Sequence, residues 1–201
     1  WIGNWKVPRW LGSLMPVVII PLLTSLVVGL AMYLALGVPL ANLMEGLQNW
    51  LSPMSGSSAV LLGIILGLMM CFDLGGPVNK AAYLFATAGL STGDESSMQI
   101  MAAVMASGMV APIALSLVTF IRKSLFTPAE QENGKSAWLL GLSFVSEGAI
   151  PFAAADPFRV IPSMMAGGTV TGAISMALSV GSRAPHGGVF VFFAIDPFWG
   201  Y

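Results

Sequence analysis

The chain has 201 residues, of which 56% are hydrophobic and 8% are charged. Soluble domains carry about 25% charged residues, so this composition excludes a soluble protein and predicts an all-α integral membrane protein. Eight basic residues against nine acidic ones give a formal charge of −1, and nucleic acid is not an expected partner. The single cysteine, Cys71, excludes an intramolecular disulfide, and its place in an apolar run predicts a buried thiol.

The two ends of the sequence have few features of a chain terminus. The first ten residues, WIGNWKVPRW, combine two basic residues with aromatic ones, which is typical of the headgroup region and favours the cytoplasmic side. They lack a signal-peptide pattern and an initiating Met, and the last residues follow an apolar run without a polar tail. We therefore expect residues 1–201 to be part of one transmembrane domain that is truncated at both ends.

The first long apolar run covers residues 14–36 and has no charge. It is long enough to cross ~30 Å of hydrocarbon at about 20 residues per span, so it predicts a spanning helix. In residues 37–54, apolar side chains recur at spacings of three and four, which predicts an amphipathic helix. Such a helix lies in the membrane interface, packs against a second subunit in a homodimer, or merely covers the bundle.

Residues 57–72 form a second apolar run, slightly short for a span. The pair Gly63 and Gly67 follows the small-xxx-small pattern and predicts close packing of two helix backbones in lipid. The run ends at DLGGPVNK (73–80), where two glycines and a proline predict a helix break. Asp73 and Lys80 bracket this break, where they pair with each other, line a polar path, or form a solvated ion pair on a surface loop.

The middle of the chain predicts one more clear span. Another apolar segment, 81–90, leads into STGDESS (91–97), which predicts a solvated loop. Residues 98–121 are uncharged and predict a spanning helix that ends at two basic residues, on the cytoplasmic side. The mixed charges of residues 127–136 then predict a cytoplasmic loop.

The stretch GLSFVSEGAIPFAAADPFR (141–159) is apolar enough to enter a bilayer, yet it carries Glu147. A carboxylate at membrane depth costs at least a few kcal/mol unless it meets a partner, a cavity or a substrate. Neighbouring glycine and proline predict broken backbone, which lipid tolerates only where it is packed in protein or lines a cavity. We therefore interpret this stretch as a polar substrate site, with Ser146 beside the carboxylate.

The last third of the chain holds a third break. Residues 160–180 are rich in small residues and predict a tightly packed internal helix. SRAPHGG (182–188) follows and contains His186, the only histidine. A structural role and a ligand role for this imidazole are equally favoured. We expect the three broken segments, 73–80, 141–159 and 182–188, to converge on one cavity.

The candidate residues also exclude several chemistries. The chain has no HExxH motif, no GxSxG elbow and no GxxxxGK[ST] loop, so no metal and no cofactor is expected. What remains is Glu147, His186 and Asn79 between unwound segments, a set suited to hydrogen bonding a polyol, as in transporter sites built from broken helices. Glu147 then takes a proton from a sugar hydroxyl or accepts a hydrogen bond from it, and the sequence leaves both alternatives open.

Three motifs carry a resemblance to a known family. FDLGGPVNKAAY (72–83), SEGAIPFAAADPFRV (146–160) and APHGG (184–188) resemble the fructose/mannitol branch of enzyme IIC, the membrane component of the bacterial phosphotransferase system (PTS). The resemblance implies a multi-pass protein of the cytoplasmic membrane with broken helices or re-entrant hairpins. It also implies a permease that translocates fructose or a related sugar while a IIB domain phosphorylates it, drawing phosphate from phosphoenolpyruvate.

The resemblance assigns roles to particular residues. Glu147 matches the glutamate that contacts the phosphorylated sugar hydroxyl, and is the expected catalytic residue. The expected substrate-binding residues are Glu147, His186, Asn79, Lys80, Asp73 and Ser146. Cys71 does not match the phosphorylated cysteine of IIB, so the phosphoryl donor lies outside this chain. The expected partners are the sugar, phosphorylated IIB, a second subunit and the bilayer. Two other functions are alternatives to the permease: an ion-coupled secondary transporter and a purely structural bundle.

Overall fold

The structure is a computed structural model that describes residues 14–39, 41–42, 46, 49, 58–91 and 93–201. The chain divides into two compact units, Trp1–Glu45 and Gly46–Tyr201. In the first unit, α2 (Ile20–Ala31) lies between the π-helical segments η2 (Met15–Ile19) and η3 (Met32–Leu36). The predicted spanning run 14–36 is therefore helical throughout, whereas the predicted amphipathic helix 37–54 lies largely outside the described residues.

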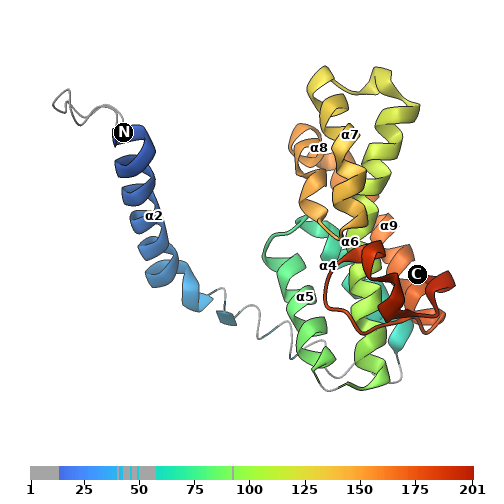
Figure 1. Cartoon of the computed structure of the whole chain (residues 1–201). Helices are drawn as coiled ribbons and strands as arrows, with labels where there is room; N and C mark the ends of the chain where they lie inside the picture. The colour runs from blue at the N-terminus through green and yellow to red at the C-terminus, as the bar shows by residue number, and fades with distance from the viewer. Residues whose placement is uncertain (1–13, 40, 43–45, 47–48, 50–57, 92) are drawn as a thin grey trace. The chain divides into compact units, whose positions relative to one another are not determined.

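The second unit is built around α6 (Glu95–Ile121), which packs against four other helices (Figure 1): α4 (Ala59–Phe72), α5 (Pro77–Leu90), α7 (Pro128–Leu142) and α9 (Pro157–Ala177). The loop predicted at 91–97 is shorter than expected, because Asp94 caps α6 by accepting a hydrogen bond from the Ser97 amide at 3.0 Å. The spanning helix predicted at 98–121 is confirmed as part of α6.

Helices α4 and α9 approach each other through glycines. A Cβ at Gly67 would lie 2.5 Å from the carbonyl carbon of Gly168, and one at Gly63 would lie 2.8 Å from that of Gly172. The close packing predicted at Gly63 and Gly67 is thus confirmed. The internal placement predicted for residues 160–180 holds for one face of α9 only, since Val170 on that helix is 58% exposed.

Residues 127–136 are not the predicted loop. They begin α7, and Thr127 and Glu130 form a capping box at its start: the Thr127 amide donates to Glu130 Oε2 at 2.7 Å, and the Glu130 amide donates to Thr127 Oγ1 at 3.4 Å. Proline at the first helical position reinforces this start. The mixed charges lie on a solvated helix face, while Ser116 of α6 donates to the carbonyl of buried Gly134 at 2.6 Å.

Two helices of the described part, α6 and α9, are long and apolar enough to cross a membrane. The segments Ile20–Ala35 and Ala59–Phe72 are apolar but shorter. Cys71 is buried, as predicted, and its thiol donates to the Ser107 carbonyl at 3.5 Å. The fold of the described residues is therefore helical, apart from one pair of short strands after α9.

That pair belongs to a compact C-terminal segment. Strand β1 (Gly181–Ser182) pairs antiparallel with β2 (Ile195–Asp196), with Gly181 opposite Asp196. Between them lies the 3₁₀ segment η7 (Gly188–Ala194), and η8 (Phe198–Gly200) follows β2. Because β1 packs against α6, this segment folds back onto the bundle.

Candidate functional site

The first broken segment lies between α4 and α5. Leu74 and Gly75 have positive φ values of 46° and 109°, and they turn the chain so that α5 starts at Pro77. The Asp73 carboxylate accepts hydrogen bonds from the amides of Val78 at 2.7 Å and Asn79 at 2.9 Å. The predicted break is confirmed, and Asp73 satisfies two of the free amides at the start of α5.

The second break follows α7 and forms a Schellman motif. The Phe144 amide donates to the Gly141 carbonyl and the Val145 amide donates to the Leu140 carbonyl, both at 2.9 Å. Phe144 occupies the left-handed position of this motif with φ 64°, where glycine is usual and where an L-residue costs about 1–2 kcal/mol. The chain then continues through η6 (Ser146–Ala149) and α8 (Ile150–Ala155) into α9.

Packing of the Phe144 side chain stabilises this strained backbone. Phe144 is buried, and its ring lies where a Cβ on Gly108 of α6 would be. On its other side, the ring centroid of His186, from the third broken segment, is 5.0 Å away, and that of Tyr83 on α5 is 6.0 Å away. Three segments distant in sequence thus meet at one aromatic cluster, which we define as Tyr83, Phe144 and His186.

Beside this cluster is a cavity of about 320 Å³, a volume within the range of small-molecule sites. All three broken segments contribute to it, so their predicted convergence is confirmed. Its lining residues are Met70, Asn79, Lys80, Tyr83, Phe144, Val145, Ser146, Glu147 and His186. Five of the six predicted substrate-binding residues lie here. The exception is Asp73, which lines a separate pocket together with residues that include Ile150 of α8.

The polar groups of the cavity are arranged around Glu147. Its Oε1 lies 3.4 Å from Lys80 Nζ, and a Cβ at Gly75, whose φ of 109° favours glycine, would lie 2.6 Å from the same oxygen. Lys80 therefore pairs with Glu147 and not with Asp73. Asn79 is 2% exposed and donates from Nδ2 to the Met70 carbonyl at 2.7 Å, which fixes the orientation of its amide at the cavity wall.

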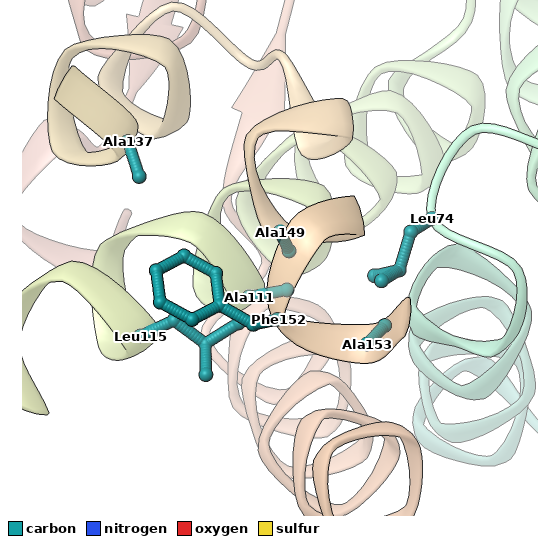
Figure 2. Close-up of a cluster of buried hydrophobic side chains, with 7 residues drawn as sticks. All are labelled: Leu74, Ala111, Leu115, Ala137, Ala149, Phe152 and Ala153. Atoms are coloured by element: carbon teal, nitrogen blue, oxygen red, sulfur yellow. The ribbon is translucent and has the colours of Figure 1, made fainter. Parts of the chain in front are cut away.

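A buried apolar cluster packs two of the breaks against α6 and α7. Figure 2 shows its members: Leu74, Ala111, Leu115, Ala137, Ala149, Phe152 and Ala153. Leu74 comes from the first break, Ala149 ends η6, and Phe152 and Ala153 lie in α8. The Phe152 ring also packs edge-on against Phe126, with centroids 5.8 Å apart. Irregular backbone is thus packed in protein on one side and lines the cavity on the other.

Sequence reasoning missed Met70, Tyr83, Phe144 and Val145. Tyr83 carried a signal, because it lies four residues after Asn79 and therefore on the same helix face. Phe144 carried none: nothing in the sequence indicates a left-handed phenylalanine at the end of α7. These residues add apolar and aromatic surface to a site that was predicted from its polar groups alone.

Comparison with known proteins identifies the family. The profile of the family described as Phosphotransferase system, EIIC matches residues 2–167. The chain belongs to this family. EIIC components are integral membrane proteins, which agrees with the predicted fold class, and the resemblance inferred from the three motifs is confirmed. No solved structure matches the chain.

Several curated EIIC relatives are similar over nearly all of the chain. The PTS system fructose-specific EIIB'BC component of Escherichia coli (strain K12) is 54% identical over 98% of the chain and 35% of that relative. The PTS system fructose-specific EIIC component of Haloferax volcanii is 50% identical over 95% of the chain and 50% of the relative. The Fructose permease IIC component of Bacillus amyloliquefaciens is 43% identical over 93% of the chain and 60% of the relative. The chain thus spans between about a third and three fifths of these EIIC relatives.

Asp73 accepts hydrogen bonds at the start of α5 and is also a predicted sugar ligand, and these two roles predict different effects of mutation on stability and on sugar affinity. In Asp73→Ala the first amides of α5 lose their acceptors, so we expect a loss of about 1–2 kcal/mol in the free energy of unfolding. Asp73→Ser, which retains one acceptor, loses less. Thermal unfolding of both variants in detergent measures this. A large loss of sugar affinity in Asp73→Ser, with unchanged stability in both variants, would instead support the predicted ligand role.

Proposed function

We propose that the chain forms the sugar-binding and translocating part of a fructose-type PTS permease. The observation that carries the proposal is the cavity where three broken segments bring together Glu147, Lys80, Asn79 and His186. Relatives that are 43–54% identical over nearly the whole chain are named as fructose-specific or fructose permease components. Fructose or a closely related sugar is accordingly the proposed substrate.

The cavity combines the two kinds of surface that a sugar presents. Carboxylate, amide and imidazole groups bind hydroxyls, while Tyr83 offers ring surface to the C–H face of the sugar. Phe144 anchors the aromatic cluster, because the Schellman motif fixes its backbone and its ring packs against α6. We propose that this cluster orients the sugar ring so that one hydroxyl meets Glu147.

The proposed reaction is phosphoryl transfer from a phosphorylated IIB unit to that hydroxyl. EIIB and EIIC are combined in the name of the Escherichia coli relative, which supports a IIB unit as partner. The contribution of this chain is positioning of the sugar, with Glu147 as the catalytic residue, and the phosphorylated group is supplied by IIB. We further propose that the protein crosses the cytoplasmic membrane several times and functions as a homodimer in the lipid bilayer.

The proposal is tested with membrane vesicles that contain the protein. Phosphoenolpyruvate and the phosphocarrier proteins are added, and a panel of sugars is assayed for uptake and phosphorylation. We expect uptake to require phosphoenolpyruvate and to deliver sugar phosphate, with fructose as the preferred substrate. Uptake driven by an ion gradient, with unmodified sugar accumulating, would overturn the proposal and support the secondary-transporter hypothesis.

A further inference from the structure

One ammonium group lies within contact distance of the proposed catalytic carboxylate. Lys80 is in the first turn of α5, and its Nζ is 3.4 Å from Glu147 Oε1. The two side chains are 50% and 44% exposed, so neither is locked in the core. Of the described residues that line the cavity, Lys80 alone carries a permanent positive charge. An exposed pair of this kind adds little to stability, and its position points to a role in the site.

The start of α5 offers no other positive charge to an anion. A helix N-terminus commonly binds phosphate through its free amides. Here the amides of Val78 and Asn79 donate to Asp73, and the Lys80 amide donates to the Gly76 carbonyl at 2.9 Å. The Asp73 carboxylate also adds a negative charge at that end. The start of α5 therefore offers the Lys80 ammonium group to a phosphate in this cavity, and these three backbone amides are already paired.

The proposed reaction creates a demand for such neutralisation. As the sugar oxygen bonds to phosphorus, the bond between phosphorus and the IIB side chain breaks, and the hydroxyl proton passes to the Glu147 carboxylate. The product is a phosphate monoester, with a charge of about −1.5 to −2 at pH 7. Catalysis of phosphoryl transfer consists mainly of positioning and of stabilising the charge on the phosphoryl oxygens, typically by Lys, Arg or metal ions.

We propose that Lys80 is a second catalytic residue, which binds the phosphoryl group during transfer and the sugar phosphate afterwards. This inference rests on the proposed function of the same cavity. Before the sugar binds, the Lys80 ammonium group is paired with Glu147. When a sugar hydroxyl replaces the ammonium group at the carboxylate, Lys80 is free to move towards the incoming phosphoryl group. Its flexible four-carbon stem allows this movement. Arg159 and Lys135 do not line the cavity and pair with Asp156 and Glu132.

The test uses three substitutions at one position in the full-length protein. Lys80→Met removes the charge at similar length, Lys80→Gln keeps a donor to Glu147 without charge, and Lys80→Arg keeps the charge. Lys135→Met, at an exposed lysine of α7 outside the cavity, is the matched control. Affinities for fructose and for fructose phosphate are measured on purified protein, and phosphorylation is measured with phosphoenolpyruvate and the carrier proteins.

We expect the Met and Gln variants to bind fructose within about threefold of wild type and fructose phosphate at least about tenfold more weakly. Their kcat for phosphorylation falls by about 10²–10³, the usual effect of removing one group that stabilises transition-state charge. The Arg variant retains most activity, and Lys135→Met behaves as wild type. Retained fructose binding in either uncharged variant also shows that the protein is folded.

Two results would overturn the inference. If loss of fructose affinity accounts for the whole loss of phosphorylation, Lys80 is an ordinary sugar ligand; if kcat is unchanged in the uncharged variants, Lys80 has no catalytic role. Failure of the proposed function gives a different result, because wild-type protein in the same assay would then phosphorylate no sugar at all. The two failures are therefore distinguishable.

Discussion

Replacing Glu147 by Gln is expected to lower phosphoenolpyruvate-dependent phosphorylation of the sugar by about 10²–10⁴, the range for loss of a general base. The amide has the shape of the carboxylate and still accepts a hydrogen bond, but it does not take the hydroxyl proton. Because the Glu147 side chain is 44% exposed and lies at the cavity wall, the fold is retained. Initial rates of sugar phosphate formation, measured in membranes with added carrier proteins, give the effect.

Glu132→Gln is the matched control for this substitution. Glu132 is an exposed carboxylate of α7 that pairs with a lysine as Glu147 does, but it does not line the cavity. We expect it to leave phosphorylation unchanged. Sugar binding to Glu147→Gln separates the two alternatives for the carboxylate. Retained binding with lost phosphorylation indicates a proton acceptor. Equal loss of both indicates that the carboxylate acts only as a charged hydrogen-bond acceptor, which the neutral amide replaces with a weaker bond. Normal uptake by Glu147→Gln would support the purely structural bundle.

The site was predictable to the extent that its signals are local. A carboxylate in an apolar run, and glycine and proline next to polar residues, each indicate a cavity-lining break without knowledge of the partner segment. Three such segments were therefore expected to converge, and they do in one cavity. Glu147, Lys80 and His186 all line this cavity, and their polar side chains are themselves the signal in the sequence.

The features that could not be predicted depend on contacts between segments that are distant in the sequence, or on sequence patterns that fit more than one structure. The partner of Lys80 lies 67 residues away, and the left-handed backbone of Phe144 exists because α6 and His186 enclose its ring. The sequence does not indicate that both carboxylate oxygens of Asp73 accept hydrogen bonds from backbone amides of α5, because those contacts form only when the chain turns at 74–76. For α7, the sequence does contain the signal, since Thr127 and Glu130 have the spacing of a capping box, but the mixed charges that follow are equally typical of a loop.

Alanine at Gly67 is expected to disrupt the packing of α4 against α9, with a loss of about 3 kcal/mol or more in the free energy of unfolding. The new Cβ would collide with the Gly168 carbonyl oxygen and lie 2.9 Å from the Thr169 amide nitrogen. Both obstacles are backbone atoms of α9, so no side-chain rotation removes the clash. Separating the helices also weakens the hydrogen bond from Ser107 Oγ to the Gly168 carbonyl, now 3.2 Å.

Gly29→Ala provides the control, because a Cβ at Gly29 in α2 meets nothing within 4 Å. Alanine is favoured over glycine in a helix by about 1 kcal/mol, so this variant should be unchanged or slightly more stable. Gly168→Ala should resemble Gly67→Ala, since its Cβ would lie 2.5 Å from the Gly67 carbonyl oxygen and 2.6 Å from Cys71 Sγ. Thermal unfolding in detergent compares all three with wild type. Equal stability of Gly67→Ala and Gly29→Ala would show that α4 and α9 do not depend on glycine contact, and that the break after α4 is positioned by other interactions.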